Sequence, residues 1–414
     1  MGRAGRPAAS SVRVVATGVL GGAVAGLILG RPSPTLAGRL AVDVVVTVVV
    51  AAALLASLRF GARRSGAWLA LLTGVVGVTA TATLVGDAAQ RSGAWAEVTI
   101  AAVGLVAAAV LAWSGAAALI GPIRARRRWL ALPVALVLLQ LVVHPVLAGV
   151  LASARLPIPP TGRVPADVGL GYEDLRLVTA DGVELAAWYV PASNGAAVVL
   201  LHGAGSTRAS TLAHAEVLAG CGYGVLMVDA RGHGDSEGLP MDLGWQADAD
   251  VRAAVDALAA RPDVEAIGLV GLSMGGEEAL TAAAGDDRVS VVVAEGVGRR
   301  SAADAGATPA GWHGWLERTV VTLDMAVADA LSTAHPPIPL REAVGRIAPR
   351  PVLLIAGRGE ADQVEWYRSA APDAVEVVSL PDTPHIGSLA ADPAWWRDTA
   401  CSHLDAAILQ GPSG

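Results

Sequence analysis

The residues with the clearest capacity for chemistry lie around Ser273. The segment Gly271-Leu272-Ser273-Met274-Gly275 has the form G-x-S-x-G, follows a short apolar run and precedes a helical stretch. In this context of strand, tight turn and helix, the glycines leave room for a strained turn that exposes the serine hydroxyl. The N-terminus of the helix favours negative charge that develops beside the serine. This pattern predicts that Ser273 is a nucleophile.

The composition argues against several other kinds of site. The two cysteines, Cys221 and Cys401, cannot form a zinc pattern, and no paired spacing of histidines and carboxylates indicates a metal. The glycine-rich loops do not precede Lys-Ser/Thr, so a phosphate cradle is unsupported. Beyond residue 163 the chain has 34 acidic residues against 15 arginines, which argues against nucleic acid as a partner.

The elements that must position Ser273 are predicted over residues 172–409. Short beta-branched runs alternate with helical stretches, and the later runs are continuously apolar, as in strands covered on both faces. The turn dipeptide Asp181-Gly182 predicts a hairpin between the first two strands. Strands are expected near 173–179, 183–190, 197–202, 224–229, 266–272, 289–295, 351–356 and 374–380, and helices near 207–220, 243–261, 274–284, 362–371 and 391–409. The pattern predicts an α/β domain.

Four segments, in chain order, resemble the alpha/beta-hydrolase family over residues 172–409. The segment HGAG beginning at His202 is similar to the family's H-G-x-G oxyanion loop. Asp229 opens a D-x-R-G-x-G-x-S segment similar to that of aminopeptidase-like and monoacylglycerol-lipase-like members. Ser273 stands in the nucleophile motif, and His385, in PDTPHIG, stands where the family has its catalytic histidine. The resemblance implies the alpha/beta-hydrolase fold, with a mostly parallel eight-stranded sheet, and a serine hydrolase that needs no cofactor.

The resemblance also implies which residues activate the serine. A serine hydroxyl needs an imidazole that takes its proton, here His385, and a carboxylate that orients this imidazole. Two carboxylates follow the strand PVLLIAG. Glu360 is preferred because it lies three residues after Gly357, the usual spacing, whereas Asp362 is the alternative because aspartate is the commoner residue type.

The oxyanion of the reaction would be held by backbone groups. By the same resemblance, these are the N–H groups of Ala204 and Met274. His202 and Gly203 are expected to support the loop that carries Ala204.

An insertion at residues 296–350 interrupts the alternation of strands and helices, where family members insert a helical cap over the active site. Its apolar residues at helical spacing are expected either to pack on the domain or to line an acyl pocket. These residues are Trp312, Trp315, Val320, Val321, Leu323, Met325, Val327 and Leu331.

The N-terminal part of the chain has a different character. Five apolar stretches, near 12–30, 36–58, 67–86, 94–121 and 129–152, each approach the ~20 residues that a membrane-spanning helix needs. They predict an all-α bundle of five transmembrane helices over residues 1–155, followed by a proline-rich linker at 156–170 and a hydrolase domain at 171–410. One face of the first stretch has Gly18, Gly22, Gly26 and Gly30, which predicts helix packing or self-association.

The arginines predict the orientation of this bundle. Ten lie at the N-terminus and after the second and fourth stretches, against three in the alternate loops. Because arginine-rich loops stay in the cytoplasm, the hydrolase domain is expected outside it. The resemblance puts Cys221 and Cys401 on helices that cover one face of the sheet, where both a disulfide and two free thiols are open. Two buried free thiols are the preferred interpretation.

The sequence therefore predicts a multi-pass protein of the plasma membrane whose extracytoplasmic domain is a serine hydrolase. Its substrate would be a small-molecule or lipid acyl compound, with an ester preferred over an amide. Two alternatives remain: an inactive hydrolase fold that acts as a sensor or interaction module, and an acyltransferase that uses the same residues.

Overall fold

The computed structural model describes residues 157–308 and 310–408, together with single helical residues between 71 and 153. The chain divides into two compact units, Met1–Leu147 and Ala148–Gly414. The five predicted membrane segments lie almost wholly outside the described residues, as do the four glycines at 18, 22, 26 and 30. None of the described helices combines the length and the hydropathy needed to cross a bilayer.

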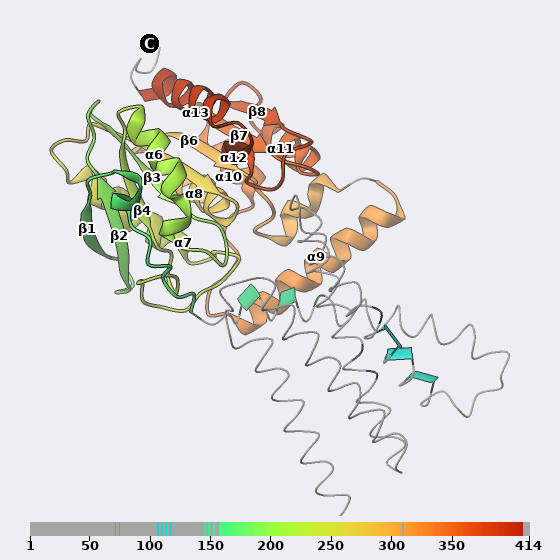
Figure 1. Ribbon diagram of the computed structural model, residues 1–414. Coiled ribbons are helices and arrows are strands. Elements are labelled where there is room, and N and C mark those ends of the chain that lie inside the picture. The colour runs from blue at the N-terminus through green and yellow to red at the C-terminus, as the bar shows by residue number, and fades with distance from the viewer. Residues whose placement is uncertain are drawn as a thin grey trace, which may run out of the picture. The chain divides into compact units, whose positions relative to one another are not determined.

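An eight-stranded sheet forms the centre of the second unit (Figure 1). Its strands lie in the order β1-β2-β4-β3-β5-β6-β7-β8. β2 pairs antiparallel with both β1 and β4, and all the other neighbours are parallel. The strands are β1 (Glu173–Val178), β2 (Glu184–Val190), β3 (Ala196–Leu201), β4 (Gly224–Val228), β5 (Ala266–Leu272), β6 (Val289–Glu295), β7 (Val352–Ala356) and β8 (Val375–Ser379). All eight were expected from the sequence, as was the hairpin turn at Gly182, which has a φ of 85°.

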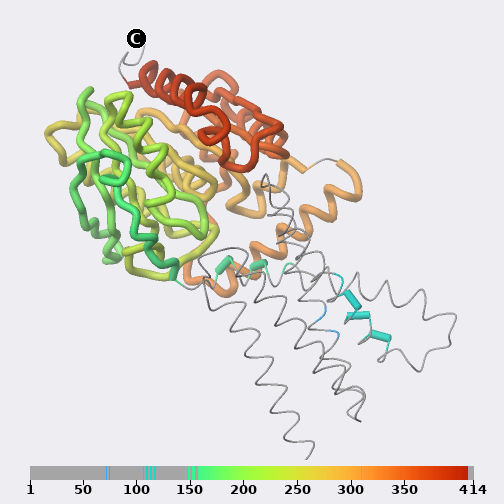
Figure 2. Tube along the Cα trace, in the orientation of Figure 1, coloured from blue at the N-terminus to red at the C-terminus, as the bar shows by residue number. Residues whose placement is uncertain are grey.

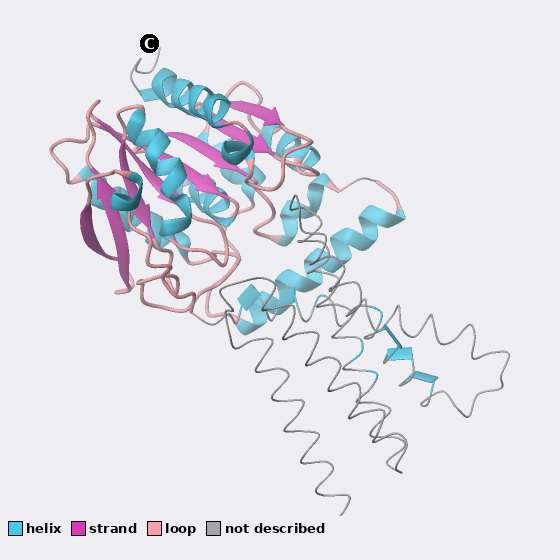
Figure 3. Ribbon diagram, viewed as in Figure 1, coloured by secondary structure: helices cyan, strands magenta, loops and turns pink. Residues whose placement is uncertain are grey.

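Helices cover both faces of this sheet (Figure 3). One face packs against α6 (Leu212–Gly220), α12 (Ser388–Ala391) and α13 (Pro393–Ile408) through a cluster that includes Leu218, Trp396 and Leu404. The other packs against α7 (Ala247–Ala259), α8 (Met274–Ala284), α10 (Leu340–Ile347) and α11 (Ala361–Arg368). The strands are continuously apolar because each contributes side chains to both clusters. Figure 2 traces the chain through this unit, from β1 and β2 in green at one edge of the sheet to α13 in red.

The predicted linker at residues 156–170 makes specific contacts with the domain. Ile158 pairs with the loop after β4, since its N–H donates to Gly232 O at 3.0 Å and its carbonyl accepts from Gly234 N at 2.7 Å. A 3-10 helix follows at Pro165–Val168, and Val168 and Leu170 pack against the same cluster as α6 and α13. This segment therefore contacts the domain at Ile158 and again from Val164 to Leu170, whereas residues 159–163 between them are exposed.

A disulfide joins Cys221, just after α6, to Cys401 in α13, with a Cα–Cα distance of 6.5 Å. The preference for two free thiols was therefore wrong. Burial of the two cysteines was a poor guide to whether their thiols are free. Both helices lie on one face of the sheet, which brings two sulfur atoms that are 180 residues apart in sequence within bonding distance.

The insertion between β6 and β7 contains a short 3-10 helix at Ala302–Ala307, the 20-residue helix α9 (Trp312–Leu331) and α10. α9 packs through Met325 and Ala328 on Met241 and Trp245, which belong to the loop after β4. The insertion is thus helical, as expected, and α9 is attached to a second loop at the carboxyl side of the sheet.

Candidate active site

Ser273 occupies a sharp turn between β5 and α8. Its backbone φ of 54° lies in the left-handed region that residues with a side chain rarely adopt. The turn closes because Gly271 and Gly275 lack side chains: a Cβ atom on Gly271 would lie 2.2 Å from Gly275 O, and one on Gly275 would lie 2.5 Å from Leu201 O. The elbow thus needs both glycines of the G-x-S-x-G sequence, and it presents the serine at the carboxyl end of the parallel strands.

His385 lies beside this serine. It follows β8 in the chain, and its Nε2 atom is 2.9 Å from Ser273 Oγ. Its Nδ1 atom is 2.6 Å from Glu360 Oε1. Three residues that are distant in sequence therefore form one chain of hydrogen bonds, with the imidazole between a hydroxyl and a carboxylate.

Glu360, rather than Asp362, is the carboxylate beside His385. The second oxygen of Glu360, Oε2, accepts a hydrogen bond of 2.7 Å from the backbone N–H of Gly357. Asp362 lies exposed in the first turn of α11. The structure therefore brings together Ser273, His385 and Glu360 and leaves the alternative acid outside this chain of hydrogen bonds.

The surroundings of His385 favour its protonated form. The hydrogen bond that His385 Nδ1 donates to Glu360 raises the pKa of His385 above 6.5, against the opposing effect of burial, and the charges of Glu277 and Glu295 act in the same direction as Glu360. An imidazolium at this position is therefore stabilised, as a general base that takes a proton from serine requires.

The predicted oxyanion loop lies against the serine. A Cβ atom on Gly203 would lie 3.2 Å from Ser273 Cβ, so the backbone at this point approaches Ser273 closely. Ala204 follows on an exposed part of the loop. Met274 is the first residue of α8, and the N–H groups of a first helical turn have no acceptor within the helix. Met274 is therefore the chain neighbour of Ser273. Ala204 follows Gly203, whose backbone lies against Ser273.

His202 connects this loop to the loop after β4. Its Nδ1 atom lies 2.8 Å from Gly203 O, and its Nε2 atom accepts a hydrogen bond from Ala230 N at 3.1 Å. Burial, with a contribution from His233, lowers the pKa of His202 to about 3, which keeps the ring neutral and able to accept. His202 thus links the loop that carries Ala204 to the loop after β4.

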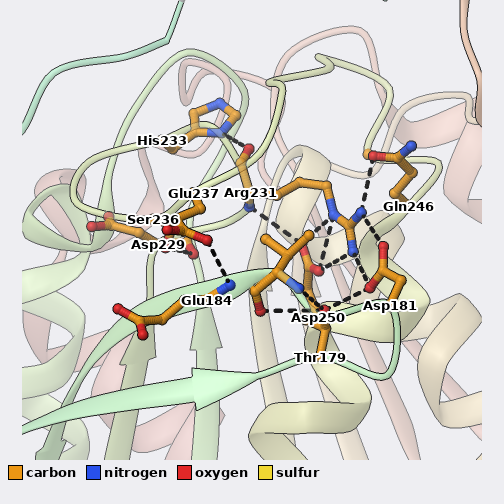
Figure 4. Close-up of polar contacts among 12 residues, drawn as sticks. Thr179, Asp181, Glu184, Asp229, Arg231, His233, Ser236, Glu237, Gln246 and Asp250 are labelled. Carbon is orange, nitrogen blue, oxygen red and sulfur yellow. Dashed lines mark hydrogen bonds and ion pairs between the residues drawn. The ribbon is translucent and has the colours of Figure 1, made fainter.

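The D-x-R-G-x-G-x-S segment forms a polar network with Asp181, Gln246 and Asp250 (Figure 4). Arg231 makes ion pairs with Asp250 at 2.6 Å and with Asp181 at 2.9 Å. Asp229 accepts hydrogen bonds from the backbone N–H groups of Arg208 and Asp235. These contacts fix the loop after β4. Ala230 in this loop donates the hydrogen bond that His202 Nε2 accepts.

Glu295 is a site residue that was not predicted. It ends β6 and is buried; its Oε1 atom accepts from Ser388 N at 3.0 Å, and its Oε2 atom accepts from Trp396 Nε1 at 3.2 Å. Its backbone carbonyl accepts from Ser273 N at 2.7 Å. One residue therefore anchors both Ser273 and the segment that follows His385. The sequence contains one sign of this role, which is a carboxylate at the end of the otherwise apolar strand VSVVVAE.

Arg300 and Glu277 form a second group that was not predicted. Glu277 Oε1 accepts from Gly298 N at 3.0 Å, and burial raises the pKa of Glu277 to about 7. Arg300 is completely buried and donates to the carbonyl of Gly244 and the hydroxyl of Thr281. These contacts tie the start of the insertion to α8. In the part of the chain that the structure describes, no group of three or more His, Cys, Asp or Glu residues is arranged to hold a metal ion.

Comparison with known proteins places these residues in context. Residues 192–335 match a family model described as serine aminopeptidase, S33. The thiohydrolase aneE of Aspergillus aculeatus is 36% identical over 129 residues, which are 30% of this chain and 40% of that protein. The alpha/beta hydrolase domain-containing protein WAV2 of Arabidopsis thaliana is 33% identical over 163 residues, 38% of this chain and 50% of that protein. The chain thus spans about 40% to 50% of the length of these two relatives.

Among solved structures, an esterase of Pyrococcus furiosus aligns with a TM-score of 0.51 and 23% sequence identity. The alignment covers 62% of this chain and 99% of the esterase. At this level of identity the likeness concerns the fold alone, and it extends over nearly all of the esterase.

Proposed function

We propose that this chain, whose fold and family-model match support membership of the alpha/beta-hydrolase family, is a serine hydrolase that cleaves esters through an acyl-enzyme. One observation carries the proposal: the hydrogen-bonded chain from Ser273 Oγ through His385 to Glu360, with distances of 2.9 and 2.6 Å, on a strained turn. A merely structural serine would need neither the left-handed backbone nor an imidazole held in one orientation by a carboxylate.

In the first half of the proposed reaction, Ser273 Oγ attacks the carbonyl carbon while its proton moves to His385 Nε2. Glu360 stabilises the resulting imidazolium. The carbonyl oxygen becomes an oxyanion, which the N–H groups of Ala204 and Met274 would stabilise. When the tetrahedral intermediate collapses, its bond to the alcohol oxygen breaks, and the alcohol leaves with the proton from His385.

The second half repeats these steps with water. His385 takes a proton from a water molecule whose oxygen attacks the acyl carbon, and the bond to Ser273 Oγ then breaks as the serine regains the proton. The products are a carboxylic acid and an enzyme in its starting state. This sequence needs no group beyond the side chains and backbone already described.

We also propose that the enzyme is a multi-pass protein of the plasma membrane with its hydrolase domain outside the cytoplasm. The five apolar stretches before residue 153 and the ten-to-three bias of the arginines support this location. The Cys221–Cys401 disulfide supports it independently, because disulfides persist in oxidising compartments. A domain tethered in this way would act on small or lipid acyl esters.

The test is covalent labelling with a fluorophosphonate probe, applied to membranes that contain the full chain. We expect the wild type to be labelled and the Ser273→Ala and His385→Ala variants to lose labelling, because each removes part of the activated serine. The matched control is Ser369→Ala, an exposed serine whose hydroxyl donates to Trp366 O. Absence of labelling in folded wild-type protein would refute the proposal and favour an inactive sensor or interaction module.

A further inference from the structure

The helix α9 presents large apolar residues to the outside. Its buried residues Gly314, Met325 and Ala328 face the domain. Trp312, Trp315 and Leu323 are 67%, 62% and 43% exposed. Helical periodicity groups the side chains of the outward face on the side opposite the buried residues. These are Trp312, Trp315, Thr319, Leu323, Ala326 and Ala330.

This outward face contains no charged residue over the whole helix. The charged side chains lie on the two flanks, nearer the domain. Glu317 pairs with Arg299 at 2.5 Å, Arg318 donates to Thr308 Oγ1 at 2.7 Å, and Asp329 lies 2.9 Å from His335. A helix at the surface of a water-soluble domain normally has its polar residues outside. The reversed order in α9 indicates that the outward face meets an apolar partner.

The position of α9 along the chain indicates which partner this is. Gly149, near the C-terminal end of the last predicted membrane segment (129–152), lies against α9: a Cβ atom on Gly149 would lie 2.6 Å from Asp324 O and 2.7 Å from Val327 Cβ. Ala152 then accepts a hydrogen bond of 3.0 Å from Asp242 N. In the proposed membrane location, the end of this segment marks the level of the bilayer surface. That level coincides with α9.

We infer that the outward face of α9 lies in the surface of a lipid bilayer, with Trp312 and Trp315 at the level of the headgroups. The inference rests on the proposed membrane location. Tryptophan suits this position because its ring is apolar and its N–H can reach polar headgroups. An uncharged face of this kind binds by burying apolar area among the lipids. The insertion that contains α9 therefore meets substrates that are dissolved in the bilayer, and the proposed esterase acts on lipid-like acyl esters.

The experiment places a fluorescent reporter of polarity on α9 of the full chain, reconstituted into phosphatidylcholine vesicles. Leu323→Cys supplies the labelling site, and the native cysteines do not compete because they form a disulfide. Val178→Cys is the matched control: another exposed apolar residue, 67% accessible, at the end of the edge strand β1. We expect the label at 323 to shift to shorter wavelengths and to lose most of its emission when the lipids contain a nitroxide quencher. The label at 178 should do neither.

Two outcomes would overturn the inference. In the first, the label at 323 reports water, as at 178. In the second, it reports an apolar environment that lipid nitroxides do not quench, which assigns the face to another part of the chain or to a second copy. Fluorophosphonate labelling of the same vesicles tests the proposed hydrolase activity separately. Failure of that proposal and failure of the proposed contact between α9 and the bilayer can therefore be told apart. Protease resistance of the labelled variants, equal to that of the wild type, establishes that they are folded.

Discussion

At the scale of single residues, Glu360 uses both of its oxygens. One contacts His385 Nδ1, and the other accepts from the backbone N–H of Gly357, three residues earlier. The spacing of Gly357 and Glu360 therefore has a physical basis, because the carboxylate binds back to the end of the strand that precedes it. An acid at position 362, two residues later and inside α11, lies beyond this turn.

Replacement of the two candidate acids separates their roles. Glu360→Gln should lower kcat/KM for an ester substrate by about 10²- to 10⁴-fold, because an amide cannot stabilise the imidazolium and can favour the wrong tautomer of His385. Asp362→Asn should leave the rate close to that of the wild type. Steady-state hydrolysis by the two variants measures the difference. A large loss in Asp362→Asn with little change in Glu360→Gln would reverse the assignment.

The pH dependence follows from the raised pKa of His385. The general base must be neutral, so kcat/KM should increase with pH through this pKa, which the Glu360 hydrogen bond holds above 6.5. In Glu360→Gln the raising effect is lost and burial still lowers the pKa. The acidic limb should therefore move to lower pH as the maximal rate falls. Profiles of kcat/KM against pH test this, and a limb that stays in place or moves to higher pH would contradict the proposed role of Glu360.

Sequence motifs identified some of the site residues but not others. Ser273 and His202 belong to local patterns whose glycines and neighbours reveal their geometry, and His385 follows from its place after the last strand. Glu295 and Arg300 act through contacts with segments that are distant in the sequence, such as Trp396 and Gly244. Nothing in their own neighbourhood specifies those partners, so only the folded chain identifies them.

At the scale of elements, the strands were predictable because burial on both faces leaves an unbroken apolar run. Each of the eight matches its expected range within about two residues. The apolar stripe of α9 was also visible, yet its direction was not. Met325 packs on the domain as expected, whereas Trp312 and Trp315 point away from it. Periodicity groups apolar residues on one side of a helix. Only tertiary contacts decide whether that side faces the domain or points away from it.

The buried Arg300 allows a test of how the insertion is attached. Its guanidinium is fully buried, lies 3.4 Å from Asp248 and attracts the buried carboxylates Glu277 and Glu278. Arg300→Met should lower the free energy of unfolding by about 3–5 kcal/mol, because it leaves buried acids without their cation.

The neighbouring arginine serves as the control for this prediction. Arg299→Met removes a more exposed ion pair with Glu317 and should cost only about 0–1 kcal/mol. Denaturant unfolding of the full chain in detergent, followed by fluorescence, compares the two variants. Equal losses of stability would show that the buried network contributes no more than a surface pair.

At the scale of the whole molecule, the two parts of the chain differ in charge as well as in hydropathy. The part up to residue 163 has 15 arginines and three acidic residues, whereas the remainder has 34 acidic residues and the same number of arginines. Of these two features, the arginines in the short loops before residue 153 bear on orientation, because Lys and Arg near membrane segments set it and acidic residues contribute little. The disulfide belongs to the acidic part and closes a loop of 180 residues, so its redox state reports the compartment of the domain.

We therefore expect Cys221 and Cys401 to be oxidised in living cells. Cells are quenched in acid, and the full chain is then alkylated in denaturant before and after reduction. The wild type should accept two alkyl groups only after reduction, because its thiols are paired. A Ser369→Cys variant adds one exposed thiol and should accept one group before reduction, which establishes that the reagent works.

Loss of the same bond should also destabilise the domain. Cys401→Ser should lower the free energy of unfolding by about 2–4 kcal/mol, since the unfolded chain gains the freedom that the closed loop denies it. Wild-type protein with reductant should fall by a similar amount, and the variant should not respond to reductant at all. If the thiols of the acid-quenched wild type are alkylated before reduction, this would contradict the oxidising compartment. It would place the hydrolase domain on the cytoplasmic side, against the bias of the arginines.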